Sequence, residues 1–567
     1  MKTILTTLNA KYIHSSTALR RLYAANKDRF DISFKEFIIK DDVYKIANDL
    51  LATKPDIIGI GVYIWNVEKS MALASILKTR QPELILIMGG PEVSYEPEFF
   101  LNKGFIDFII SGEGEFVLGE LLSTLSNNPS GNYSQIDLES VSHPHRINKT
   151  AAKANLKKLA ALPSPYMLPE DRENRKNRYV YFETSRGCPY HCRYCLSSLE
   201  KGVRYFPLEH VFQNLEYLIE NNARQVKFTD RTFNLNLDRT RAIFDFLISK
   251  YKPGLSFQFE IYADLLTEEL IDYLNEVLPP HYFRFEIGIQ STYDPTNRAI
   301  GRNQNFNLIS THIKKLMDGQ KVDLHLDLIA GLPHETFERF KKSFDDVFAL
   351  RSKEIQLGFL KMLRGTALRR DADLHGYRYN QNAPYEIIYS NALTAEDIRR
   401  IHSVELTLNK YWNSGKFKRA MQALFDTSEY KNRYFDFFDE LAQFYDKRPL
   451  PVNYHPEDLF LRLHQFLRSK GLDLLSELQK DYYSCYKIRP HGFWENRIDK
   501  KTRKRLLSQI SNDKPFLKTH QLNRYIIEKQ TAIDVIDENN YLLTVFYTDE
   551  SRENPLFLTY PIRSSYL

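Results

Sequence analysis

The sequence has 567 residues, 43% of them hydrophobic and 26% charged, which is enough for two or three domains with real cores. Its 78 basic and 72 acidic residues leave a net charge of +6, and over this length that charge does not argue for a nucleic-acid partner. The sequence shows no membrane span, no signal peptide and only four cysteines, which excludes a secreted disulfide scaffold and favours a cytoplasmic protein.

Residues 1–125 alternate short apolar runs with amphipathic stretches. We expect strands at 3–8, 31–38, 57–62, 84–88 and 105–110, and helices between them, for example at 16–26, 44–53 and 67–80. Apolar strands that alternate with helices predict a Rossmann-like parallel sheet covered on both faces. Ligands of such sheets bind at the carboxyl ends of the strands, where Gly89, Gly90 and the segment 111–114 lie.

The rest of the chain divides into three further parts. Turn-rich residues 136–177 are expected to be a linker after a first domain of residues 1–135. Residues 178–370 return to the strand–helix alternation and predict a partial TIM-type barrel of six strands, at 178–183, 225–229, 256–262, 282–289, 323–329 and 354–360. Residues 371–567 predict a mostly helical α+β domain that shapes the substrate pocket, with helices at 395–413 and 457–470 and a hairpin over 531–548. The predicted fold class is α/β.

Three cysteines follow the first predicted barrel strand within eight residues: Cys188, Cys192 and Cys195. Three thiolates can bind three irons of a four-iron cubane and leave the fourth iron open to a small chelating ligand. A structural zinc would need a fourth ligand, such as His191 or the distant Cys485, and such sites usually come as paired Cys-x-x-Cys knuckles. The pattern therefore favours a 4Fe-4S cluster, with zinc as the alternative.

The spacing Cys-x-x-x-Cys-x-x-Cys, with an aromatic residue before the third cysteine, resembles the signature of the radical S-adenosylmethionine (SAM) superfamily. The segments 286–291, 327–336 and 364–366 resemble other parts of that barrel. The resemblance implies reductive cleavage of SAM to a 5′-deoxyadenosyl radical, with an electron donor such as flavodoxin or ferredoxin. It implies that Tyr194 lies near the adenine, that Glu286 and Gln290 contact the ribose and carboxylate, and that Asp230 meets the amino group.

These polar residues also have structural interpretations. Asp230 is placed by position only, because the Gly-Gly-Glu triplet usual in that loop is absent. Glu286 could pair with a barrel lysine or arginine, and Gln290 could cap a strand end. Polar groups at the ends of barrel strands are commonly catalytic or binding residues, which favours the functional interpretation of Glu286 and Gln290.

A Rossmann-like domain before such a barrel resembles the cobalamin (B12)-binding radical SAM proteins. The segment 9–16 and the long aromatic C-terminal region resemble an uncharacterised branch with a C-terminal domain of unknown function. The resemblance implies bound cobalamin, with room for its nucleotide tail at Gly89 and Gly90 and hydrogen-bond donors at Asn9 and Ser15.

The cobalt ligand is left open by the sequence. Many cobalamin domains carry Asp-x-His-x-x-Gly, but His14 lacks both the aspartate and the glycine, so it could equally be a loop histidine that bonds to the corrin or the backbone. Trp65 could cover the lower face of the corrin or belong to the core. Glu113 opens the last helix of the domain, where backbone N–H groups can meet a polar group.

These observations favour a cobalamin-dependent radical SAM enzyme, a transferase that methylates an unactivated carbon of a small-molecule or peptide substrate. The alternatives are a non-methylating rearrangement or cyclisation with the same cofactors, and a non-catalytic corrinoid or cluster sensor. A methylthiotransferase would need three further cysteines, and only Cys485 is left. The basic run 500–505 favours a solvated helix face over an RNA site, and Cys485 is expected to be a buried small hydrophobe. No nucleic-acid or membrane partner is predicted.

Overall fold

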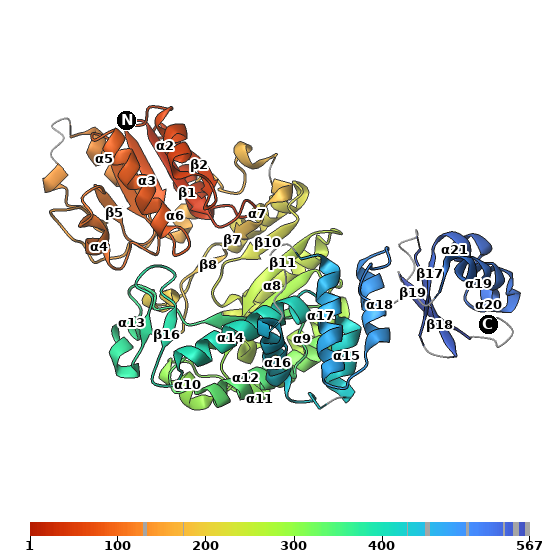
Figure 1. The fold of residues 1–567 in the computed structure, drawn as a ribbon. Coiled ribbons are helices and arrows are strands. Elements are labelled where there is room, and N and C mark those ends of the chain that lie inside the picture. Colours follow the sequence, from red (N-terminus) through yellow and green to blue (C-terminus); the bar gives the residue numbers. More distant parts are fainter. Residues whose placement is uncertain are drawn as a thin grey trace. The chain divides into compact units, whose positions relative to one another are not determined.

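The computed structural model describes the chain except residues 129–132, 174, 428, 448–453, 495–497, 537–538, 548–554 and 562–567. The chain forms two compact units, Met1–Ile398 and Arg399–Leu567. The first unit contains two parallel sheets, and the second contains helices and one small antiparallel sheet (Figure 1). Over the described residues, no helix is both long and apolar enough to cross a membrane.

The first sheet has the order β2-β1-β3-β4-β5-β6. The strands β1 to β5 pair in parallel, and only β6 is antiparallel. One apolar cluster packs α2 and α3 on one face, and a second packs α1 and α5 on the other, so the predicted doubly covered sheet is confirmed. The elements are β1 (Thr3–Asn9), α1 (Thr17–Asn26), β2 (Ile32–Ile38), α2 (Val43–Leu51), β3 (Ile57–Gly61), α3 (Val67–Arg80), β4 (Ile85–Gly89), α4 (Pro97–Leu101), β5 (Phe108–Ile110), α5 (Glu115–Ser126) and β6 (Val141–Ser142).

The predicted linker is folded onto the first sheet. The strand β6 extends that sheet, and Ala152 forms an isolated bridge to Gly112. The short helices of this segment are α6 (Leu156–Ala160), η2 (Pro169–Asp171) and η3 (Arg175–Asn177), and η1 (Tyr133–Gln135) directly precedes it. The backbone of residues 140 and 152 therefore lies against the loop at the carboxyl end of β5.

The second sheet contains six parallel strands in sequential order, β7-β10-β11-β12-β13-β14, and it forms an open partial barrel. All six predicted barrel strands are present. They are β7 (Val180–Phe182), β10 (Gln225–Phe228), β11 (Ser256–Ile261), β12 (Phe283–Gln290), β13 (Asp323–Ala330) and β14 (Glu354–Phe359). A small hairpin of β8 (Ser185–Arg186) and β9 (Arg204–Tyr205) follows the first of them.

Helices connect the barrel strands. They are α7 (Leu208–Glu220), α8 (Leu237–Ser249), α9 (Glu268–Val277), α10 (Asp294–Ala299), α11 (Phe306–Asp318) and α12 (Phe337–Phe348), with short turns η4 (Leu196–Leu199), η5 (Phe233–Leu235) and η6 (Ala263–Leu265). Each strand alternates between two faces. One face is aromatic and packs on Phe244 of α8, whereas the other carries polar residues such as Gln258, Glu260, Arg284 and Glu286.

The aromatic face supplies a stability prediction. Phe259 is fully buried, with ring centroids 4.5 Å from Phe233 and 4.6 Å from Phe228. Phe259→Ala is expected to lower the free energy of unfolding by about 3–5 kcal/mol, because it removes a large buried side chain and leaves a cavity. Denaturant unfolding measures this loss. Leu308→Ala on the surface of α11, where the side chain is 40% exposed, should change stability by no more than about 0.5 kcal/mol. Equal losses in the two variants would contradict this assignment of the core.

The C-terminal part begins with α13 (Ala367–Arg370), η7 (Ala372–His375), β15 (Arg378–Tyr379), β16 (Ile387–Tyr389) and α14 (Ala395–Leu408). The second unit continues with the π-helical turn η8 (Asn409–Asn413), α15 (Lys418–Thr427), α16 (Tyr434–Lys447), α17 (Pro456–Ser469), α18 (Leu475–Cys485), α19 (Lys500–Asn512), α20 (Lys514–Thr519), α21 (Arg524–Lys529), β17 (Thr531–Val535), β18 (Asn540–Val545) and β19 (Leu556–Pro561). The predicted hairpin pairs β17 with β18, although its residues 537, 538 and 548 lie outside the described residues.

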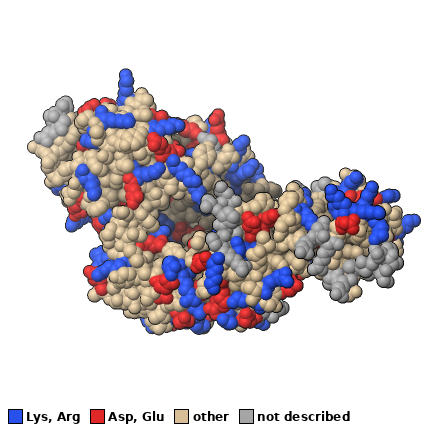
Figure 2. Space-filling model, in the orientation of Figure 1, with Lys and Arg blue, Asp and Glu red and all other residues tan. Residues whose placement is uncertain are grey.

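Two expectations for this region have different outcomes. The basic run at the start of α19 is mostly exposed, as expected for a solvated helix face. On the visible face of the molecule, lysine and arginine are interspersed with acidic residues (Figure 2). The expectation that Cys485 is buried is wrong: it is exposed at the end of α18, because the apolar side of that helix is formed by Leu478, Tyr482 and Tyr483 instead.

Candidate active site

The three clustered cysteines lie in the loop between β8 and β9, beyond the carboxyl end of the first barrel strand. Cys188 and Cys192 are buried, Cys195 is half-buried, and all three thiols are free. Gly187 makes the entry to this loop possible: its φ is +93°, and a Cβ atom there would overlap the carbonyl oxygen of Gly202. The sequence Gly-Cys therefore starts a tight turn that only glycine fits.

Backbone hydrogen bonds hold the rest of the cluster loop. The N–H of Arg193 donates to the carbonyl of Ile300 at 2.9 Å, and the carbonyl of Arg193 accepts from the N–H of Leu368 at 2.9 Å. The N–H of Cys195 donates to the carbonyl of Cys192 at 3.0 Å. The loop is thus fixed from two sides, by the residue after α10 and by α13, before any cofactor binds.

The three thiols are a donor set that an iron–sulfur cubane or a single metal ion could use. Within the described ranges, no three His, Cys, Asp or Glu side chains converge on one point that could hold a metal ion. A mononuclear zinc needs its thiolates at about 2.3 Å from a common centre, whereas a cubane distributes its thiolates over separate irons. Three free thiols in one preformed loop, without convergence on one centre, are therefore compatible with the larger group.

Two arginines, Arg302 and Arg231, lie near these thiols. The Arg302 guanidinium stacks 4.8 Å above the ring of Tyr262 and donates from Nε to Gln304 at 2.7 Å. Burial raises the pKa of the Cys192 thiol, and the positive charge of Arg302 opposes that rise. Arg231 pairs with Glu260 at 3.3 Å. The neighbouring Tyr194 has its pKa raised by burial, so its hydroxyl stays protonated.

Asp230, which the sequence analysis assigned to the amino group of SAM, is used inside the protein. It is 2% exposed, and its carboxylate accepts hydrogen bonds from the Thr184 hydroxyl at 2.6 Å, the Ser185 hydroxyl at 2.5 Å and the Thr184 N–H at 3.0 Å. These contacts tie the loop after β10 to the loop after β7. The adjacent Arg231, rather than Asp230, lines the large cavity described below.

Glu286 and Gln290 lie on β12, as expected, but in different surroundings. The Glu286 carboxylate accepts from the Gln258 side chain, and Glu286 is the register partner of Glu260 on β11. Gln290 has φ +69° and is 9% exposed, and its side-chain oxygen has no hydrogen-bond partner among the described residues. A buried acceptor without a donor is costly, so the unpaired oxygen of Gln290 is compatible with its predicted ligand contact, whereas Glu286 already accepts from Gln258.

Glu335 in the Gly-Leu-Pro-His-Glu-Thr segment gives a pH prediction. It is fully buried, accepts from Ser291 and Ser343 at 2.5 and 2.6 Å, and burial raises its pKa from about 4.5 to about 7. Because the pKa of this carboxyl is higher in the folded protein than in the unfolded protein, its contribution to the free energy of unfolding is fully present below pH 4.5. That contribution is lost as the pH rises towards 7, and the free energy of unfolding falls by roughly 3 kcal/mol at most.

Glu335→Gln is therefore expected to be more stable than the wild type at pH 8 and to lose this advantage at pH 5. Thermal melts of the two proteins across this pH range measure the difference. A stability difference between wild type and variant that does not change with pH would show that Glu335 is ionised throughout. Glu338→Gln, on the exposed first turn of α12, is the matched control and should give no pH-dependent difference.

A cavity of about 470 Å³ joins the carboxyl end of the first sheet to the stem of the cluster loop. Its first wall is formed by loops after β3, β4 and β5, which include the predicted residues Gly89, Gly90 and Glu113. Its second wall includes Glu183, Ser185, Arg186, Gly187, Leu196, Thr229 and Arg231. Its inner end is apolar, between Leu5, Leu19, Leu22, Ile87, Ile110 and Leu118.

Cobalamin has a broad ring and an elongated nucleotide tail. Small residues such as Gly89 in the lining of this cavity are compatible with that tail. At Gly89 a Cβ atom would point to open space, with the Ile110 carbonyl oxygen 3.6 Å away as its nearest neighbour. At the rim, Tyr63 stacks on Trp65 with centroids 4.5 Å apart, and Trp65 is 48% exposed rather than part of the core.

The residues Asn9, His14 and Ser15 do not line this cavity. The Asn9 amide donates to Glu36 at 2.9 Å, the His14 Nδ1 lies 2.6 Å from the Tyr181 hydroxyl, and the Ser15 hydroxyl donates to the Tyr179 carbonyl at 2.7 Å. In the structure the contacts of His14 and Ser15 fasten the loop after β1 to residues 179–181 at β7, whereas Asn9 at the end of β1 bonds to Glu36 on β2. Their roles towards cobalamin remain predictions.

Comparisons with known proteins agree with this geometry. A model of the B12 binding domain matches residues 4–122, a model of the radical SAM superfamily matches residues 182–347, and a model of a protein of unknown function (DUF4080) matches residues 373–555. The chain is 29% identical over 255 residues to 2-(S-pantetheinyl)-carbapenam-3-carboxylate methyltransferase of Streptantibioticus cattleyicolor, an alignment that covers 42% of this chain and 37% of that protein.

Two further relatives match over more of the chain. The cobalamin-dependent radical SAM methyltransferase TokK of Streptomyces tokunonensis is 24% identical, over 84% of this chain and 74% of its own length. The structure of the cobalamin-dependent SAM radical enzyme OxsB with aqua-cobalamin and SAM bound superposes with a TM-score of 0.62 at 14% identity, over 87% of this chain and 82% of that one. That likeness shows a shared fold.

The matched models show a B12-binding domain followed by a radical SAM domain, and the predicted α/β class is confirmed. After these two domains, the chain carries the C-terminal DUF4080 domain. The three predicted cofactors agree with the matched families: the 4Fe-4S cluster and SAM with the radical SAM superfamily, and cobalamin with the B12 binding domain.

Proposed function

We propose that this protein is a cobalamin-dependent radical SAM methyltransferase. The observation that carries the proposal is the single cavity that has Gly89 and Gly90 on one wall and Gly187 and Arg231 on the other. A methyl group can pass directly between a corrinoid and SAM when the two are bound side by side. One shared cavity between the cobalamin slot and the cluster loop meets that requirement.

The residues divide into three roles. Cys188, Cys192 and Cys195 would hold the cluster, and Tyr194, Gln290 and Arg302 would surround the SAM bound beside it. When bound, the cluster and SAM would supply the hydrogen-abstracting radical, and the corrinoid would carry the methyl group. Gly89, Gly90 and the Glu113 loop would hold the corrinoid. Arg231, which faces the cavity, would place a positive charge next to the anionic carboxylate of SAM.

For the substrate, we propose only a chemical class. Because the inner face of the barrel sheet is polar, with Gln258, Glu260, Arg284 and Glu286 on it, a small molecule or peptide with polar groups fits the space beyond SAM. The carbapenam methyltransferase and TokK, which are related in sequence, support the choice of methyl transfer over rearrangement. A low-potential donor such as flavodoxin or ferredoxin would supply the electrons.

The test is an anaerobic incubation of reconstituted protein with cobalamin, a reductant and SAM that carries a deuterated methyl group. We expect 5′-deoxyadenosine and S-adenosylhomocysteine together, and a substrate product that is heavier by one labelled methyl group when extracts of candidate substrates are supplied. Formation of 5′-deoxyadenosine alone, with an unlabelled rearranged product, would favour the non-methylating alternative. Formation of neither nucleoside would favour a sensor.

A further inference from the structure

Arg186, two residues before the first cysteine of the cluster loop, is the centre of a buried ion-pair network. Its guanidinium reaches Glu113 at 3.0 Å, Glu115 at 2.5 Å and Glu183 at 2.8 Å. The side chains of all four residues are at most 13% exposed. Glu113 and Glu115 belong to the loop and first turn after β5 of the first sheet, whereas Arg186 and Glu183 belong to the barrel.

Two more arginines complete the network. Arg21 on α1 reaches the other oxygen of Glu183 at 2.5 Å, and Arg204 on β9 pairs with Glu113. The N–H of Ala154 donates to Glu113 at 2.7 Å. Three guanidinium groups therefore balance three carboxylates. A buried network of this kind is costly to desolvate, and its best-attested use is to fix one register of the parts that it joins.

The position of the network suggests what it fixes. Glu113, Glu115, Glu183 and Arg186 all line the large cavity, and Gly187 and Cys188 follow Arg186 directly. The planar guanidinium binds carboxylates bidentately, so it holds both distance and angle. The loop that would contact the corrinoid and the stem of the loop that would hold the cluster are thus joined through one side chain.

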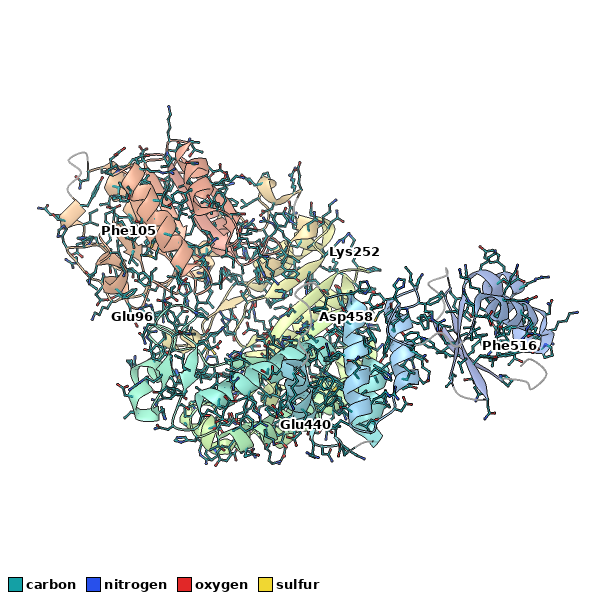
Figure 3. All side chains as sticks on the ribbon, in the orientation of Figure 1. Glu96, Phe105, Lys252, Glu440, Asp458 and Phe516 are labelled. Atoms are coloured by element: carbon teal, nitrogen blue, oxygen red, sulfur yellow. The ribbon has the colours of Figure 1, made fainter. Side chains whose placement is uncertain are left out.

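A second buried arginine joins the same two sheets elsewhere. Arg364, in the loop after β14, pairs with Glu92 at 3.1 Å and with Glu96, and is 5% exposed. Glu96 is labelled in Figure 3 and immediately precedes α4, and the Tyr385 hydroxyl also donates to Glu92. Neither Arg364 nor its two acidic partners lines the cavity. The chain therefore offers an internal comparison: both arginines attach the first sheet to the barrel, but only Arg186 lines the cavity and stands directly before Gly187 and Cys188.

We propose that Arg186 is a positioning residue that sets the placement of bound cobalamin relative to the SAM held at the cluster. This inference rests on the proposed function. Transfer between two bound groups depends steeply on their geometry, and a displacement of about 1 Å can cost on the order of a hundredfold in rate. Arg186 would therefore act on methyl transfer between the cofactors more than on the reductive cleavage of SAM.

The test uses the full chain, reconstituted with iron, sulfide and cobalamin, and supplied with SAM and titanium(III) citrate without substrate. S-adenosylhomocysteine records the transfer of the methyl group to the corrinoid, and 5′-deoxyadenosine records reductive cleavage. We expect Arg186→Lys to lower the ratio of the first product to the second at least fivefold during the first turnover, and Glu115→Gln to lower it in the same direction. Arg364→Lys, the matched control, should stay within twofold of the wild-type ratio.

A second readout needs no cofactor. Hydrogen exchange in the cofactor-free protein should rise in peptides over 112–118 and 185–205 for Arg186→Lys, and it should not rise there for Arg364→Lys. An unchanged exchange pattern or product ratio in Arg186→Lys overturns the inference, and so does an equal fall of the ratio in Arg364→Lys. If the wild-type protein itself forms neither nucleoside, it is the proposed function that fails.

Discussion

Cys192→Ala is expected to abolish cluster binding and to reduce 5′-deoxyadenosine formation below detection, at least a thousandfold. Cys192 is 8% exposed, in a loop whose backbone is already fixed by hydrogen bonds to Ile300 and Leu368. A cubane that has lost one of three thiolates is no longer retained with an open iron for SAM. Iron and sulfide analysis and the charge-transfer absorption of the reconstituted protein measure cluster binding. Nucleoside chromatography measures 5′-deoxyadenosine formation.

The control for that variant is Cys485→Ala. Cys485 is exposed on α18 in the second unit, so its removal should leave iron content and 5′-deoxyadenosine formation at wild-type levels. Cobalamin binding should persist in Cys192→Ala, because Cys192 does not line the cavity proposed for the corrinoid. Retention of a full cluster in Cys192→Ala, or its loss in Cys485→Ala, would contradict the assignment of the three thiols.

Gly89→Leu is expected to weaken cobalamin binding at least a hundredfold while the protein remains folded. Gly89 ends β4 and lines the cavity, and a Cβ atom there has only the Ile110 carbonyl oxygen near it, at the ordinary distance of 3.6 Å. The leucine side chain would therefore extend into the slot without a backbone clash. Because the slot would then be filled, the nucleotide tail would lose the space that it needs.

A graded series at the same position supplies the control. Gly89→Ala adds only the Cβ atom and should weaken binding by no more than about fivefold, since alanine needs no repacking there. Equilibrium dialysis against hydroxocobalamin measures the binding, and thermal melting checks the fold. Equal affinities for wild type and Gly89→Leu would show that cobalamin binds outside this cavity.

Much of the fold is readable in the sequence because the signals are periodic. Five apolar strands of the first sheet and six of the barrel recur with helices between them, and the structure has all eleven. The strands that sequence patterns missed include β6, which has two residues, too few for any periodicity, and β19, which pairs with β18 beyond the predicted hairpin. The predicted linker offered polar turns, and its packing onto the first sheet depends on contacts far apart in the chain.

The candidate site was less predictable, for a physical reason. The cysteine spacing and Gly89-Gly90 can be recognised in the sequence because each lies within one short segment of the chain. The partners of Asp230, His14 and Arg186 come from segments that are distant in the sequence, so no local pattern indicates whether a polar group faces a ligand or a neighbouring loop. The prediction that Cys485 is buried was wrong because the sequence does not indicate on which face of an amphipathic helix a single cysteine lies.

The most direct test of the account is an anomalous-diffraction structure of the anaerobically reconstituted protein, with data collected at the iron and cobalt absorption edges. The account predicts iron peaks bound by Cys188, Cys192 and Cys195, and a cobalt peak in the cavity between Gly90 and Arg231. Cobalt outside that cavity in a folded protein, or a single zinc ion coordinated by the three cysteines, would contradict it.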